Sequence, residues 1–161
     1  MIENLVLFRH GKAQRPYEAP DDFTRELVAR GRDDAVLQAS RLARSGFYPD
    51  IVCVSTALRA AQTWDCASQF FEGAKVKWAR DLYHASADTY LDIARNSSSK
   101  NVLIIAHDPG LHELCRRFLK GSQEDLSANE LHLGFPTAAI AWFAADETNR
   151  FGFELREFFT L

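Results

Sequence analysis

The chain has 161 residues, of which 47% are hydrophobic and 25% charged, so it can bury a sizeable core within one domain that spans residues 1–161. The formal net charge of −3 argues against a general nucleic-acid binder, which more often has a basic face. No basic leader precedes a long apolar segment, and no run approaches the roughly 20 apolar residues that span a bilayer, so we expect a cytoplasmic protein without a membrane partner.

Apolar runs and helix-like periodicities alternate along the chain, and turn residues separate them. Strands that alternate with helices indicate a mostly parallel sheet covered on both faces, so the expected fold is a three-layer α/β/α domain. Polar loops are expected at 11–22 and 121–132. The predicted strands are 2–8, 51–54, 75–78, 101–106, 137–143 and 151–159, and the predicted helices are 24 to about 45, 58–71, 88–96 and Pro109 to about 120, the last with Asp108 as its N-cap.

Polar side chains follow three of the predicted strands at the point where each strand ends. Arg9 and His10 follow the first strand, Arg59 follows the second after a short segment, and His107 follows the strand at 101–106. In open α/β sheets, ligands bind at the carboxyl ends of the strands. We therefore expect these four side chains to meet in one pocket.

Two arginines and two histidines in one pocket suit phosphoryl transfer, because the moving group carries negative charge on three oxygens that fixed cations stabilise. The planar fork of arginine can donate two hydrogen bonds to one phosphate. A neutral histidine can accept the phosphoryl group on one ring nitrogen while the other nitrogen donates a proton to a fixed acceptor. Gly11 lets the backbone turn sharply beside the ligand. This chemistry needs no metal and no other cofactor.

Three segments resemble, in order and spacing, the signature blocks of the histidine phosphatase superfamily, which is also called phosphoglycerate mutase-like. The blocks are Arg9-His10-Gly11, residues 55–63 and residues 106–110. The short chain, Lys12-Ala13 and the run Arg25-Glu26-Leu27 before Gly31 are similar to the small SixA-type phosphohistidine phosphatases. The resemblance covers nearly the whole chain and implies a phosphoglycerate mutase-like fold.

The resemblance also implies roles for the four strand-end residues. His10 would be the phosphorylated nucleophile, and Arg9, Arg59 and His107 would form the phosphate pocket. Lys12 and Arg25 are either ordinary surface cations or contacts to the substrate.

The segment at 81–85 departs from the mutase branch of the superfamily, which places a glutamate there as proton donor. His84 occupies that position in this chain. A proton donor matters most when the leaving group is a poor one, such as an alkoxide, whereas the imidazole of phosphohistidine can depart already protonated. The missing carboxylate therefore favours a phosphoramidate substrate and argues against mutase activity. His84 remains a candidate to bind the substrate or relay a proton.

Three hypotheses stay open. The favoured one is a phosphohistidine phosphatase that acts on a phosphorylated signalling or phosphocarrier protein, because the chain is too short for a large lid domain and its site can admit a protein loop. The others are a phosphatase of a small phosphoester or sugar phosphate and a non-catalytic phosphate-binding module. A metal site made of His10, His84 and His107 is disfavoured, because the two arginines would repel the ion.

Overall fold

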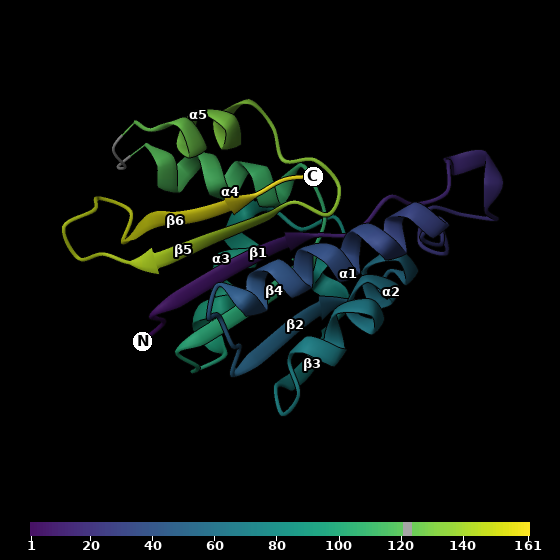
Figure 1. Cartoon of the computed structure of the whole chain (residues 1–161), viewed down its shortest axis with the longest axis horizontal. Coiled ribbons are helices and arrows are strands. Elements are labelled where there is room, and N and C mark those ends of the chain that lie inside the picture. The colour runs from purple at the N-terminus through teal and green to yellow at the C-terminus, as the bar shows by residue number, and fades with distance from the viewer. Residues whose placement is uncertain (121–123) are drawn as a thin grey trace.

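A six-stranded sheet forms the centre of the protein (Figure 1), in a computed structural model that describes residues 1–120 and 124–161. The strand order is β3-β2-β4-β1-β5-β6. The strands are β1 (Asn4–Arg9), β2 (Ile51–Ser55), β3 (Lys75–Ala79), β4 (Asn101–Ala106), β5 (Ile140–Ala145) and β6 (Phe153–Phe159). Strands β1 to β4 run parallel, β5 pairs antiparallel with β1, and β6 pairs antiparallel with β5. The prediction of a mostly parallel sheet is confirmed.

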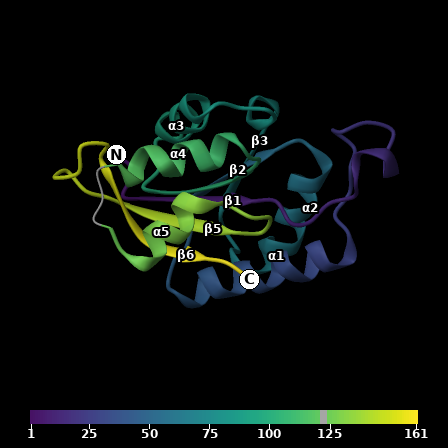
Figure 2. The ribbon, with the colours of Figure 1, turned by 90° about the horizontal axis from the view of Figure 1, so that it is seen from above.

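Helices cover both faces of this sheet (Figure 2). Helices α1 and α2 pack against one face, and α3, α4 and α5 pack on the other side. The helices are α1 (Ala29–Arg44), α2 (Leu58–Ala67), α3 (Ala87–Asn96), α4 (Gly110–Leu119) and α5 (Leu126–Leu133), with short 3-10 helices at Pro16–Glu18, Ser68–Phe70 and Arg80–Leu82. The predicted three-layer architecture is therefore correct. None of the helices in the described ranges combines the length and apolar character that a bilayer span requires.

The unbroken apolar run of β1 follows from its place in the middle of the sheet. Leu5 and Leu7 pack in the cluster formed with α3 and α4, whereas Val6 and Phe8 pack in the cluster formed with α1 and α2. All four side chains are completely buried, because alternate residues of a strand point to opposite faces and both faces are covered. The side chains of the neighbouring β4 alternate between the two clusters in the same way. Because β4 pairs parallel with β1 and Arg9 lies opposite Ala106, the carboxyl ends of the two strands lie side by side.

Helix α1 begins at Ala29, so the predicted start at residue 24 is wrong. Residues 24–28 approach the chain that follows β1: Val28 N–H donates to the Lys12 carbonyl, and Ala13 forms a bridge with Leu27. The backbone at Val28 is extended, so the helix starts only after it. Apolar residues at helical spacing were a misleading signal here because the contacts that hold the segment come from residues far away in the sequence.

The polar loop predicted at 121–132 is wrong in its later part, where α5 forms. The carboxylate of Asp125 accepts the Ala128 N–H and caps the helix. Only Ala128 and Leu131 of this helix are buried, which explains why its apolar periodicity is weak. Residues 121–123 lie outside the described part of the chain.

Other boundaries also differ from the prediction: β5 begins at Ile140 and not at residue 137, and β6 begins at Phe153 and not at residue 151. Two differences concern the start of α4 and the end of α2. Pro109, and not Asp108, occupies the N-cap position of α4, and the Asp108 carboxylate instead accepts the N–H of His112 inside the helix. The regular part of α2 ends at Ala67 and continues as a 3-10 turn over Ser68–Phe70. Neither difference changes the order of elements.

Two glycines allow the loop after β1 to lie directly against the start of α1. A side chain at Gly11 would collide with the carbonyl group of Gly31, and a side chain at Gly31 would collide with that of Lys12. The two backbones therefore approach more closely than any other residue permits. This contact fixes where the loop leaves His10 at the end of the sheet.

Candidate active site

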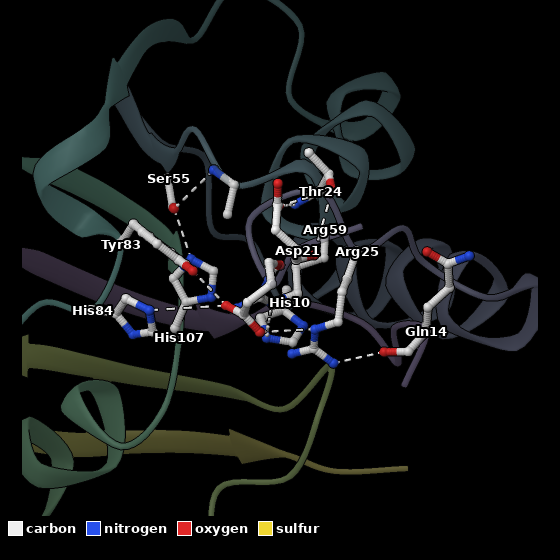
Figure 3. A network of polar contacts seen from close by, with 12 residues as sticks. His10, Gln14, Asp21, Thr24, Arg25, Ser55, Arg59, Tyr83, His84 and His107 are labelled. Atoms are coloured by element: carbon white, nitrogen blue, oxygen red, sulfur yellow. Dashed lines mark hydrogen bonds and ion pairs between the residues drawn. The ribbon is translucent and has the colours of Figure 1, made fainter. Parts of the chain in front are cut away.

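The strand-end residues predicted from the sequence meet at one edge of the sheet (Figure 3). His10 directly follows β1, Arg59 lies in the first turn of α2, and His107 directly follows β4. Arg59 Nε lies 3.2 Å from His10 Nε2, and the rings of His10 and His107 are 5.2 Å apart. All three residues are buried. The predicted convergence is therefore present in the fold.

Arg9 reaches the same edge but turns its guanidinium towards other partners. Its Nη1 donates to the Phe135 carbonyl at 2.8 Å and lies 3.5 Å from Asp108 Oδ2. Its Nε is buried and has no hydrogen-bond partner. A buried donor without a partner is costly, so this nitrogen is suited to receive an oxygen of a bound anion.

The ring of His10 is held in the orientation and tautomer of a nucleophile. Its Nδ1 lies 2.8 Å from the Gly11 carbonyl, which can only accept, so Nδ1 carries the proton and Nε2 carries the lone pair. Burial, reinforced by the charges of Arg59 and Arg9, lowers the pKa of His10 to about 3. The imidazole is therefore neutral near pH 7, and the lone pair of Nε2 accepts the Nε–H of Arg59 at 3.2 Å until an electrophile takes its place.

His107 is arranged as a neutral hydrogen-bond donor. Its Nε2 lies 2.7 Å from the Ser55 hydroxyl, and that oxygen also accepts the Ala57 N–H. Ser55 can then donate its proton to Nε2, which leaves the proton of the neutral ring on Nδ1. This Nδ1 is buried without a partner. Burial lowers the pKa of His107 to about 2, and the neighbouring His10 and Arg59 act in the same direction.

The sequence reasoning missed Asp22, which the loop after β1 brings to Arg59. Its carbonyl accepts Arg59 Nη1 at 2.7 Å, and its Oδ2 lies 3.2 Å from Arg59 Nη2 and 2.5 Å from the Tyr83 hydroxyl. Burial alone raises the pKa of Asp22, but the hydrogen bond from Tyr83 and the charge of Arg59 outweigh it and lower the pKa to about 2. Residues 81–85 had suggested a site without a carboxylate, but Asp22 supplies one from a different loop. The available signal was weak: an aspartate in a polar loop, three residues before Arg25.

Of the remaining candidates, Arg25 lies closest to this network. Its Nε donates to Asp22 Oδ1 at 2.9 Å, and its charge contributes to the lowered pKa of His10. His84 lies at the rim with a side chain that is 72% exposed, and its Nε2 is 3.9 Å from Asp22 Oδ2. Lys12 is exposed and meets its neighbours through its main chain. Within the described residues, no three histidine, cysteine or carboxylate side chains are grouped as a metal site would require.

Comparison with known proteins identifies solved structures of the same fold. No family model and no curated protein sequence matches the chain. Among solved structures, the chain is similar to a protein assigned as the phosphohistidine phosphatase SixA of Agrobacterium tumefaciens, with 26% identity, a TM-score of 0.87, and coverage of 100% of this chain and 99% of that chain.

Two further structures show the same fold. A protein assigned as SixA of Nakamurella multipartitia has 23% identity and a TM-score of 0.82, with 98% of this chain and 95% of that chain covered. The protein histidine phosphatase SixA complexed with tungstate has 24% identity and a TM-score of 0.76, with 98% and 96% covered. Because similarity extends along the whole chain and the signature blocks meet at one edge of the sheet, the protein has a phosphoglycerate mutase-like fold and resembles the SixA histidine phosphatases in size and fold.

Proposed function

We propose that the protein is a phosphatase that forms a covalent phosphohistidine intermediate on His10 and removes phosphate from phosphohistidine in a signalling or phosphocarrier protein. One observation carries the proposal: the neutral ring of His10 has Nδ1 bonded to the Gly11 carbonyl and Nε2 facing Arg59. This is the arrangement that a nitrogen nucleophile needs beside a cation that stabilises the phosphoryl oxygens.

The reaction proceeds in two displacements. In the first, His10 Nε2 forms a bond to phosphorus as the bond from phosphorus to the substrate nitrogen breaks, and the substrate imidazole, already protonated on its other ring nitrogen, leaves as a neutral ring with that electron pair. In the second, the oxygen of a water molecule forms a bond to phosphorus, the bond from phosphorus to His10 Nε2 breaks and its electron pair returns to Nε2, and phosphate is released as the water loses a proton. Arg59, the partnerless Nε of Arg9 and Nδ1 of His107 are the donors for the phosphoryl oxygens in both steps.

The chemistry of the leaving group favours phosphohistidine over an alkyl ester. Imidazole leaves without a proton from the enzyme, whereas an alkoxide needs one in the transition state. The residue after Tyr83 is an exposed histidine, which is a poor substitute for a positioned acid. Three solved structures similar to this chain, with TM-scores of 0.76 to 0.87, are named as SixA proteins, which supports the same substrate class.

The remaining parts of the proposal follow from the sequence and the position of each residue. Arg25 and His84 lie beside Asp22, Lys12 is exposed on the loop after β1, and all three would contact the substrate. The single domain of residues 1–161 would act in the cytoplasm on a protein and not on a nucleic acid, in line with the net charge of −3. No step in this scheme requires a metal.

The test compares steady-state rates on a phosphohistidine peptide with rates on a panel of sugar phosphates and simple alkyl phosphates. We expect kcat/KM to be highest for the peptide, and His10→Ala to abolish turnover while leaving the circular dichroism spectrum unchanged. Full activity in His10→Ala would exclude the covalent mechanism. A sugar phosphate that reacts faster than the peptide would identify the protein as a small-ester phosphatase.

A further inference from the structure

Asp22 lies on the far side of Arg59 from the nucleophile. The Nε of Arg59 lies 3.2 Å from His10 Nε2, and its Nη2 lies 3.2 Å from Asp22 Oδ2. One guanidinium thus separates a carboxylate from the atom that would carry the phosphoryl group. A phosphoryl group on His10 would lie in contact with this guanidinium, and the carboxylate would face it from the solvent side.

The carboxylate is held in place by its own set of donors. Arg25 Nε binds Oδ1 at 2.9 Å, and the Tyr83 hydroxyl binds Oδ2 at 2.5 Å. Tyr83 also contacts the ring of His107 edge-on, with ring centres 5.6 Å apart. The loop after β1 and the turn after β3 therefore position one oxygen of Asp22, Oδ2, on the side of the site that faces Arg59 and His107.

We propose that Asp22 is the general base for the second displacement, the hydrolysis of phosphorylated His10. The oxygen of a water molecule forms a bond to phosphorus while the bond from phosphorus to His10 Nε2 breaks, and the electron pair of that bond returns to Nε2. The proton of the water passes to Asp22 Oδ2, which later releases it to solvent. This assignment rests on the proposed function, because it requires a phosphorylated His10.

The electrostatics fit a base that is activated by the intermediate. Tyr83, Arg59 and Arg25 lower the pKa of Asp22 to about 2, and of these Arg59 also contacts His10 Nε2, the atom that would carry the phosphoryl group. When Arg59 binds the phosphoryl group, Asp22 loses a cation and gains a nearby anion, so its pKa rises and it becomes a stronger base. The carboxylate therefore accepts a proton most readily when the intermediate is present.

The negative charge of the Asp22 carboxylate also favours one class of substrate. A carboxylate that is ionised throughout the neutral range has no proton to give to a departing alkoxide in the first displacement. It suits substrates whose leaving group departs without help, which is the case for phosphoramidates such as phosphohistidine. The site is thereby equipped to assist the second step and not the first.

The test measures the two steps separately with the whole chain and a phosphohistidine peptide, by rapid quenching and mass measurement of the intact protein. For Asp22→Asn we expect His10 to become phosphorylated at nearly the wild-type rate and hydrolysis to slow by about 10²- to 10⁴-fold, the range typical of a general base. Phosphorylated protein should then accumulate to one phosphate per chain.

Asp21→Asn is the matched control, because it removes the neighbouring loop carboxylate, which binds the N–H and hydroxyl of Thr24 instead. Both steps should keep wild-type rates in this variant. A second variant, Asp22→Gly, leaves space for a small carboxylate, so added formate should speed its hydrolysis step.

Three results would contradict the assignment of Asp22: equal slowing of both steps in Asp22→Asn, hydrolysis at the wild-type rate, or no response of Asp22→Gly to formate. Equal slowing would mean that Asp22 only positions Arg59. Failure of the wild-type protein to become phosphorylated at His10 is a separate outcome, which would overturn the proposed function itself.

Discussion

The site is made of two regions that differ in how they are held. The residues at the strand ends are enclosed by the sheet and its helices, whereas those on the loop after β1 and the turn after β3 face solvent. The side chain of Arg59 is 5% exposed, compared with 41% for Asp22 and 72% for His84. We infer from this difference that the two regions have different roles. The buried cations and histidines bind the phosphoryl group, and the solvent-exposed side chains of the loop after β1 and the turn after β3 contact water and transfer protons.

Backbone bonds explain the rigidity of the first region. His10 N–H donates to the Ala106 carbonyl and Arg9 N–H donates to the Ala139 carbonyl, so the strand end is tied to both neighbouring strands. The second region is connected to the first mainly by side chains, above all through Asp22. Such contacts can exchange when a ligand arrives, while the strand ends stay where they are.

Replacing one arginine from each region gives the largest expected contrast. Arg59→Ala should lower kcat/KM by about 10²- to 10³-fold, or about 3 kcal/mol, because it removes a buried donor to the phosphoryl oxygens. Arg25→Ala should lower it by about fivefold, or about 1 kcal/mol, because its partly exposed charge is screened by water. Steady-state kinetics and the inhibition constant of tungstate measure both effects.

The control for this pair is Arg59→Lys, which keeps the charge but not the fork. It should recover little of the lost activity, because an ammonium group cannot bridge two phosphoryl oxygens in a fixed plane. Equal losses in Arg59→Ala and Arg25→Ala would remove the distinction between the two regions.

Acid stability tests the buried region alone. In the folded protein the pKa of His10 is about 3 and that of His107 is about 2, both below the ordinary value of 6.5. Below pH 6.5 these two histidines therefore bind protons in the unfolded chain but stay neutral in the folded protein. The free energy of unfolding should therefore fall by about 1.4 kcal/mol per pH unit for each histidine as the pH decreases from 6.5 towards 4. Above pH 6.5 this contribution to stability is fully present.

Denaturant unfolding at pH 7, 6 and 5 measures this slope. His10→Gln removes one of the two groups and should reduce the slope by about 1.4 kcal/mol per pH unit. An identical slope in the variant would mean that His10 takes up its proton at the same pH in the folded and the unfolded chain, which would contradict the lowered pKa of this residue.

The smallest effect is expected at the rim. His84→Ala should change kcat/KM for a phosphohistidine peptide by less than about twofold, because the ring is exposed and, within the part of the chain that the structure describes, lies beside Asp22 and Tyr83 without a hydrogen bond or ion pair to His10 or Arg59. Parallel assays on alkyl and aryl phosphates would show whether His84 donates a proton. A loss confined to the alkyl esters would contradict this account and assign the proton donor to His84.

The same division explains what the sequence alone could predict. His10, Arg59 and His107 follow apolar segments that only a covered sheet accommodates, so their meeting point follows from parallel strand order. Asp22 reaches the site through a loop whose path depends on the close contact of Gly11 with Gly31. No periodicity encodes such a contact. Helix α5 was missed for a related reason, since its capping aspartate and two buried residues are a weak local pattern.

The most direct test of the central claim is the position of the phosphoryl group in the trapped intermediate. Wild-type protein mixed with a phosphohistidine peptide and quenched in alkali can be analysed by phosphorus NMR and by fragmentation mass spectrometry. Because Nδ1 of His10 is bonded to the Gly11 carbonyl, we expect one acid-labile phosphate on His10, attached to Nε2. Phosphate on Nδ1, on His107, or on no histidine at all would contradict the account.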